Sequence, residues 1–214
     1  MLDRFKAFWQ GKALAPFINL FVKLGISPDV VTWVGTLGVS AGALVFFPQG
    51  WLWQGVLVIT VFIFSDLIDG AMARKIGRTD KFGAFLDSTL DRVADAALFG
   101  GMALFFAWQT EDRLYLVLSL ICLAMGSVTS YARAKGEHLG FNAKTGLAER
   151  PDRLVGLLIP TFFGDLFDIP ILYEVALWLI AALSTITVIQ RILLVRRQAL
   201  APPNTESAGT PPQP

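Results

Sequence analysis

The chain has 214 residues, of which 54% are hydrophobic and 16% charged, and its formal net charge is +1. Together with a mean hydropathy of +0.58, this composition excludes an ordinary soluble domain and gives no sign of a nucleic-acid partner. The single cysteine, Cys122, lies in an apolar run, which argues against a disulfide framework and against redox chemistry. We therefore expect an all-α integral membrane protein.

The N-terminal segment, residues 1–24, alternates charged with aromatic residues and lacks the apolar core of a signal peptide. If it forms an amphipathic helix, its aromatic side chains face lipid, while Arg4, Lys6 and Lys12 lie near lipid phosphates. We predict a helix in the membrane interface, in contact with membrane lipids.

Apolar stretches then follow that are long enough, or nearly long enough, to cross a bilayer. They are 30–47, 51–65, 82–106, 114–132, 154–167 and 171–194. Cations precede the first stretch, lie between the second and third and between the fourth and fifth, and follow the sixth. The remaining connections hold a single cation, Arg113. By the positive-inside rule this pattern predicts a bundle of six transmembrane helices in the cell membrane with both termini cytoplasmic. The bundle occupies residues 25–197, and the polar, Pro-rich segment 198–214 is expected to be a disordered cytoplasmic tail.

Four acids flank the connection between the second and third stretches. Asp66 and Asp69 are three residues apart on one expected helix, and Asp87 and Asp91 are four apart on the next, so each pair shares a helix face. Unpaired carboxylates cost about 3 kcal/mol each in a membrane helix, so a cation must compensate them. Oxygen ligands without histidine or thiolate favour Mg²⁺ or Mn²⁺, and four carboxylates can hold two ions, as in phosphoryl transfer.

The acids and their neighbours carry a resemblance to a known family. Eight residues match the D-x2-D-G-x2-A-R-x8-G-x3-D-x3-D signature of the CDP-alcohol phosphotransferases with every spacing kept: Asp66, Asp69, Gly70, Ala73, Arg74, Gly83, Asp87 and Asp91. Three shorter pieces, "SPDVVT", "SYARAKGE" and "ERPDR", resemble the actinobacterial phosphatidylinositol phosphate synthase branch. The likeness covers most of the chain.

The resemblance implies a six-helix enzyme, usually a homodimer, that transfers a phosphatidyl group from CDP-diacylglycerol to an acceptor hydroxyl and releases CMP. It implies that Asp66, Asp69 and Asp87 bind metal and that Asp91 is the base. The Asp91 carboxylate is also expected to contribute to metal binding. Residues expected around the nucleotide are Gly70, Ala73, Arg74 and Gly83, together with Asp29, Thr32 and Asp80, for which helix capping and solvation in a loop are equally good explanations.

The basic residues near the cytoplasmic ends point to the acceptor. Arg133, Lys135 and Arg153 flank the fourth and fifth stretches, and Arg191 lies within the sixth, where a lipid-anchoring role fits poorly. If they point inward, they form a trap for a phosphate carried by the acceptor. Inositol phosphate or glycerol 3-phosphate fits such a trap, and the resemblance favours inositol phosphate.

Two alternatives remain beside a phosphatidylinositol phosphate synthase. A phosphatidylglycerophosphate synthase would use glycerol 3-phosphate in the same trap. A divalent-cation transporter would also carry intramembrane acids, but it should distribute them through the membrane depth. The role of Asp95, one helical turn after Asp91, is left open between a helix-to-helix hydrogen bond and a part in the site.

Overall fold

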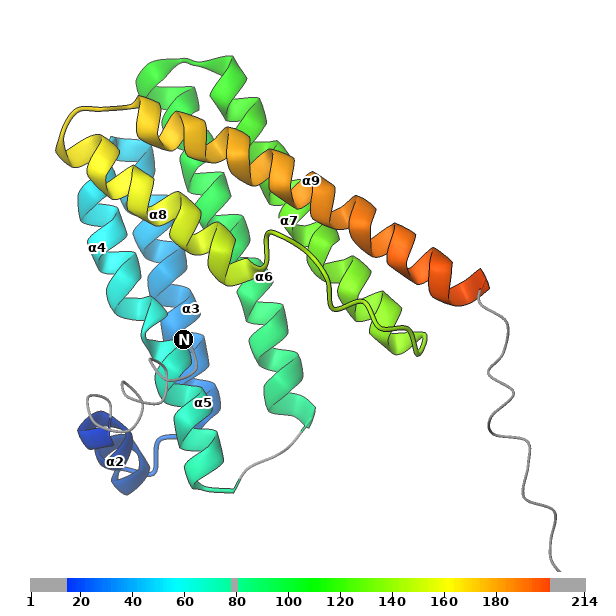
Figure 1. Ribbon diagram of the computed structural model, residues 1–214. Helices are drawn as coiled ribbons and strands as arrows, with labels where there is room; N and C mark the ends of the chain where they lie inside the picture. Colours follow the sequence, from blue (N-terminus) through cyan, green and yellow to red (C-terminus); the bar gives the residue numbers. More distant parts are fainter. Residues whose placement is uncertain (1–14, 78–80, 201–214) are drawn as a thin grey trace, which may run out of the picture.

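The computed structural model describes residues 15–77 and 81–200, apart from the side chains of Phe17 and residues 65–67. These residues form helices and no strand (Figure 1). In chain order the helices are α2 (Ala15–Lys23), α3 (Pro28–Ala41), α4 (Leu52–Ile63), α5 (Ser65–Lys75), α6 (Lys81–Phe105), α7 (Arg113–His138), α8 (Arg150–Leu166) and α9 (Ile171–Leu200). Short turns continue α3 through η2 (Gly42–Phe46) and η3 (Phe47–Gln49), and α6 through η4 (Phe106–Thr110).

Helix starts follow signals in the sequence. The Ser27 hydroxyl accepts from the backbone N–H of Val30, and Pro28 occupies the first helical position of α3. At α7, a carboxylate oxygen of Asp112 accepts from the backbone N–H groups of Leu114 and Tyr115. These caps fix where two helices of the bundle begin.

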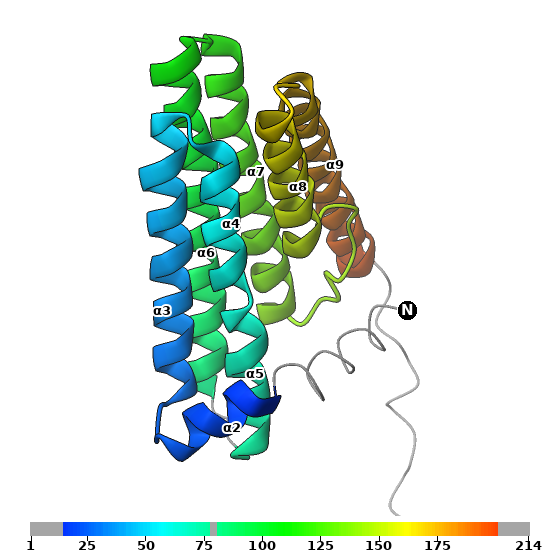
Figure 2. The same ribbon diagram turned by 90° about the vertical axis from the view of Figure 1, so that its left-hand side faces the viewer.

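Helices α3, α4 and α6 run side by side, and α7 packs against α6 (Figures 1 and 2). Helices α8 and α9 cross the bundle obliquely in Figure 1, with α8 packed against α4 and α9 against α7. The core lies between them and is formed by side chains such as Phe47, Leu98 and Leu157, which are fully buried. The turn η2 approaches α6 so closely that a Cβ at Gly101 would lie 2.6 Å from the carbonyl oxygen of Ala43. The small residue therefore sets the helix spacing that holds α6 in place.

The second apolar stretch continues as a helix beyond residue 65. Helix α4 ends at Ile63 and α5 begins at Ser65, with Phe64 between them in a helical backbone conformation. The first acids of the signature lie on α5, which packs against α3.

Helix α2 lies across the end of the bundle beside α5 (Figures 1 and 2). Ile18 packs there against Val31 and Met72, and the ammonium group of Lys75 donates to the side chain of Asn19. The predicted interfacial helix at 1–24 falls for the most part on residues 1–14, which lie outside the described residues. The expected tail at 198–214 lies outside them too, except that α9 continues to Leu200.

Four helical stretches in the described residues are long and apolar enough to cross a membrane. They are Pro28–Gln49, Leu52–Lys75, Arg113–His138 and Ile171–Leu200. The chain is accordingly a membrane protein. The other two predicted spans correspond to α6, whose first half is charged, and to α8, which has only 17 residues, so the count of six stays a prediction.

Candidate active site

Asp69 of α5 is held by hydrogen bonds from two elements. The Thr32 hydroxyl of α3 donates to one carboxylate oxygen at 2.6 Å, and the backbone N–H of Gly70 donates to the other at 2.5 Å. The carboxylate is buried. Thr32, expected near the nucleotide, therefore orients a signature acid in this structure.

Asp87 and Asp91 lie one turn apart on α6, with Asp87 exposed and Asp91 half-buried. In the part of the chain whose side chains are described, no three histidine, cysteine or acidic side chains gather as a metal-binding group. The side chain of Asp66 lies outside that part. The all-carboxylate donor set suits a hard divalent cation in its chemistry, whereas its assembly around an ion stays a prediction.

The remaining signature residues lie on the same two helices. On α5, the Arg74 guanidinium folds back over Gly70, where a Cβ would lie 3.6 Å from Nη1. Ala73 lies on α5 between them, and Gly83 is near the start of α6. Asp29 is in the first turn of α3, and Asp80 lies outside the described residues. Their nucleotide contacts stay predictions.

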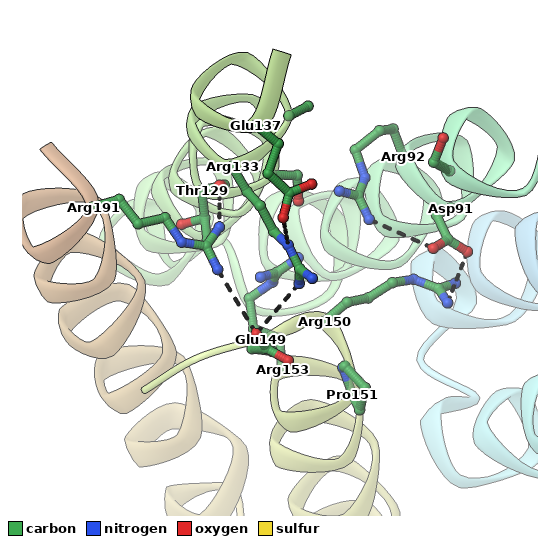
Figure 3. A pocket seen from close by; sticks show the side chains of 13 residues that line it. Asp91, Arg92, Thr129, Arg133, Glu137, Glu149, Arg150, Pro151, Arg153 and Arg191 are labelled. Carbon is green, nitrogen blue, oxygen red and sulfur yellow. Dashed lines mark hydrogen bonds and ion pairs between the residues drawn. The ribbon is translucent and has the colours of Figure 1, made fainter. Parts of the chain in front are cut away.

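Next to Asp91 is a cavity of about 270 Å³ (Figure 3). Helices α6, α7, α8 and α9 all contribute to its wall. The lining residues are Ser88, Asp91, Arg92, Thr129, Ser130, Arg133, Ala134, Glu137, Glu149, Arg150, Pro151, Arg153 and Arg191. The structure thus brings three of the four predicted acceptor-binding cations, Arg133, Arg153 and Arg191, to one cavity with one signature acid.

Lys135 does not line this cavity and is exposed on α7. Helix α7 continues to His138, past the expected end of the span at 132. Residues two positions apart on an α-helix point about 200° apart around its axis, so Lys135 cannot share the face of Arg133. Its contact with the acceptor stays a prediction that this arrangement does not favour.

Asp95 joins α6 to α8. It is buried and forms an ion pair with Arg153 at 2.9 Å, while Arg153 also donates to the carbonyl of Ala148 at 3.1 Å. Gly126 makes room for this arginine, since a Cβ there would lie 3.1 Å from Nε. The ion pair gives Asp95 a role between two helices, which the sequence left open.

Arg150 and Arg92 surround the same acids. Arg150 contacts Asp91 at 2.8 Å and Asp95 at 3.4 Å, and Arg92 contacts the same two carboxylates at 3.8 and 3.7 Å. Sequence reasoning assigned no role to either arginine. A signal existed for Arg150, because it lies in the "ERPDR" piece, and for Arg92, because it is three residues before Asp95.

Arg191 is almost completely buried, with 3% of its side chain exposed. Its Nε donates to the carbonyl of Thr145 at 2.8 Å, and Nη1 donates to the carbonyl of Thr129. The Thr187 hydroxyl, one turn earlier on α9, accepts from the backbone N–H groups of Leu147 and Ala148. The connection from α7 to α8 is thus fastened along α9, and this places Glu149 and Arg150 at the cavity.

The cavity wall suits binding of a phosphorylated polar molecule. It offers guanidinium groups, which hold phosphate oxygens well. It also offers Asp91, a carboxylate able to accept a proton from a nearby hydroxyl. Such a wall fits an acceptor that carries a phosphate and presents a hydroxyl toward α6.

Comparison with known proteins agrees with the resemblance to the CDP-alcohol phosphotransferases. A family model described as CDP-alcohol phosphatidyltransferase matches residues 25–186. The chain is 48% identical over 205 residues to the phosphatidylinositol phosphate synthase of Streptomyces avermitilis, covering 93% of this chain and 84% of that protein. It is 39% identical over 206 residues to the synthase of Mycolicibacterium smegmatis, covering 93% of each.

Solved structures are similar over the same length. The Mycobacterium tuberculosis phosphatidylinositol phosphate synthase with CDP-diacylglycerol bound has a TM-score of 0.80 at 40% identity, covering 84% of this chain and 92% of that one. The same enzyme in complex with manganese and citrate has a TM-score of 0.81 at 40% identity, covering 85% and 88%. The family model alone spans well over half of the chain. This protein belongs to the CDP-alcohol phosphatidyltransferase family.

Proposed function

We propose that the protein transfers the phosphatidyl group of CDP-diacylglycerol to a hydroxyl of inositol phosphate, giving phosphatidylinositol phosphate and CMP. One observation carries the choice of a phosphorylated acceptor: a single cavity is lined both by Asp91 of the signature and by arginines from three further helices. The relatives named phosphatidylinositol phosphate synthase support inositol phosphate over glycerol 3-phosphate.

The chain's own groups divide the work. Arg133, Arg153 and Arg191 would bind the acceptor phosphate and so orient the acceptor, and Asp91 would take the proton from the attacking hydroxyl. Gly70 and Arg74 of α5 would contact the nucleotide. Asp66, Asp69, Asp87 and Asp91 would hold divalent ions, Mg²⁺ or Mn²⁺, whose charge offsets that of the diphosphate and of the departing CMP. The manganese complex of the related enzyme supports divalent-ion dependence.

We further propose six membrane spans with both termini and the site at the cytoplasmic side, and a homodimer as the functional unit. The cation distribution in the sequence supports the orientation. Family membership supports an enzyme over the cation transporter considered from the sequence.

The decisive experiment incubates purified protein with CDP-diacylglycerol, Mg²⁺ and one acceptor at a time, and measures CMP release and the lipid product. Inositol phosphate should react, and free inositol should not react comparably, because it has no phosphate for the arginines to bind. A chelator should abolish the reaction, and added Mg²⁺ or Mn²⁺ should restore it. Preferential use of glycerol 3-phosphate would establish a phosphatidylglycerophosphate synthase instead.

Arg133 is the clearest probe of the phosphate contacts. Arg191 donates to two backbone carbonyls, so its replacement would also disturb packing, whereas Arg133 is only half-buried and contacts side chains. Arg133→Gln should raise the KM for inositol phosphate about tenfold or more, because a charge-assisted hydrogen bond of about 1.5 to 3 kcal/mol is lost, while the KM for CDP-diacylglycerol changes little.

Lys135→Gln provides the matched comparison on the same helix. It removes the same charge from a side chain that does not line the cavity, so the acceptor KM should change less than threefold. Equal effects of the two substitutions would show that general charge near the membrane, and not contact in the cavity, determines acceptor affinity.

A further inference from the structure

An acid of the chain itself lies among the cations of the cavity. The Glu149 carboxylate is 3.4 Å from Nη1 of Arg133 and 3.9 Å from Nη2 of Arg191. Figure 3 shows it between these two guanidiniums, which come from α7 and α9, while Glu149 itself immediately precedes α8. A negatively charged group therefore bridges two helices at the point where their cations converge.

The Arg191 and Glu149 side chains of this contact differ in exposure. Arg191 is 3% exposed and is fixed by the carbonyls of Thr145 and Thr129, whereas the Glu149 side chain is 47% exposed. The ion pair between the partly exposed Arg133 and Glu149 side chains contributes little to stability. The Glu149 carboxylate also takes part in the capping box at the start of α8, together with Asp152. A phosphate that displaces this carboxylate therefore replaces a weak ion pair and a capping contact, while the buried arginine stays in place.

We propose that Glu149 is a specificity-determining residue. Its carboxylate occupies the position between the guanidiniums of Arg133 and Arg191 that the acceptor phosphate takes, here called the phosphate seat, until a phosphate displaces it. This inference rests on the proposed function for the location of that seat. A carboxylate carries one negative charge, and a phosphate monoester near neutral pH carries between one and two. The seat thus yields to a phosphorylated acceptor and resists singly charged anions, which gain less from the same two guanidiniums.

The test measures binding of inorganic phosphate to the full-length protein in detergent by calorimetry. Glu149→Gln keeps the size of the side chain but removes the competing charge, so the Kd for phosphate should fall about threefold to fivefold, the upper part of the range for one exposed ion pair. Chloride should compete with phosphate more strongly in this variant than in wild type. Glu149→Ser, which restores a favourable helix N-cap, should show the same gain if the start of α8 is disturbed by Gln.

Glu137→Gln is the matched comparison. Glu137 also lines the cavity and contacts Arg133 at 3.2 Å, but it lies on the same helix four residues later. Among the described residues its ion pair is with Arg133, so removal of its charge should shift the Kd less than twofold. A similar gain in both variants would mean that net charge alone governs anion binding and would overturn the proposal.

Weaker phosphate binding in both Glu149→Gln and Glu149→Ser would also overturn it, because Glu149 would then support the site and not compete for it. The outcome is separable from that of the proposed function. If wild type binds phosphate and Glu149→Gln binds it more tightly, but inositol phosphate is not turned over, the seat stands and the assigned acceptor falls. If inositol phosphate is turned over while Glu149→Gln leaves the Kd unchanged, only the role of Glu149 falls.

Discussion

Asp91→Asn should lower the turnover number at least about a hundredfold, since general-base catalysis typically contributes a factor of 10² to 10⁴. Among the described signature acids, Asp91 is the one that lines the arginine-rich cavity, so it is the one placed to accept a proton from the acceptor. The substitution should not unfold the protein, because Arg150, its ion-pair partner at 2.8 Å, also contacts Asp95. CMP release at saturating substrates measures the effect.

Binding of CDP-diacylglycerol separates this role from that of a metal ligand. Asp91→Asn should keep nucleotide-lipid affinity within a few fold, because Asp66, Asp69 and Asp87, the three acids expected to bind metal, remain. Asp87→Asn, one turn away and exposed on the same helix, should lose both affinity and turnover. If Asp91→Asn weakens CDP-diacylglycerol binding as much as Asp87→Asn does, Asp91 acts chiefly as a metal ligand.

Asp95→Asn should reduce the free energy of unfolding by about 3 kcal/mol or more, which thermal unfolding in detergent can follow. Its carboxylate compensates Arg153, a side chain with only 2% exposure. Removal of one partner of a buried ion pair leaves the other charge buried and unpaired, and this typically costs about 3 to 5 kcal/mol. Glu137→Gln, which breaks the exposed pair with Arg133, should change stability by less than about 1 kcal/mol.

The double variant Asp95→Leu with Arg153→Met tests the reason for that loss. Replacement of a whole buried ion pair by apolar side chains of similar volume is often neutral or stabilising. The double variant should therefore be more stable than Asp95→Asn, although it should be inactive with inositol phosphate because Arg153 is gone. A double variant less stable than either single change would show that the destabilisation comes from packing and not from the unpaired charge.

Local patterns in the sequence predict much of the fold. Hydrophobic runs and cation clusters locate the helical stretches to within several residues, and Ser27 with Pro28 marks the start of α3. The division into α4 and α5 at Phe64 was not predicted, because nothing in the residues around Phe64 interrupts a helix by its own propensity. The predicted span stops at 132 because the residues after it are polar. Hydropathy locates the part of a helix that lies in the membrane, whereas α7 itself continues to His138.

The candidate site was likewise predicted only in part from the sequence. The spacing of the four acids and the position of Arg191 within an apolar run are visible in the sequence, because each violates the local expectation for a membrane helix. Arg150 and Glu149 violate none, since they lie in a polar connection where charge is normal. Their importance comes from packing of α8 against α6 and from attachment of the connection to α9, which only the folded chain reveals.

That attachment makes helix register a property of the site. Thr187, Arg191 and Gln198 all bind the connection between α7 and α8, the last through a paired contact of its side-chain amide with the backbone of Asn142. Steps of four and seven residues keep the three within about 40° of one another on α9. A one-residue insertion between them would rotate the later anchors by about 100° and release the segment that carries Glu149 and Arg150. Length in this half of α9 is therefore constrained as tightly as residue identity in the cavity.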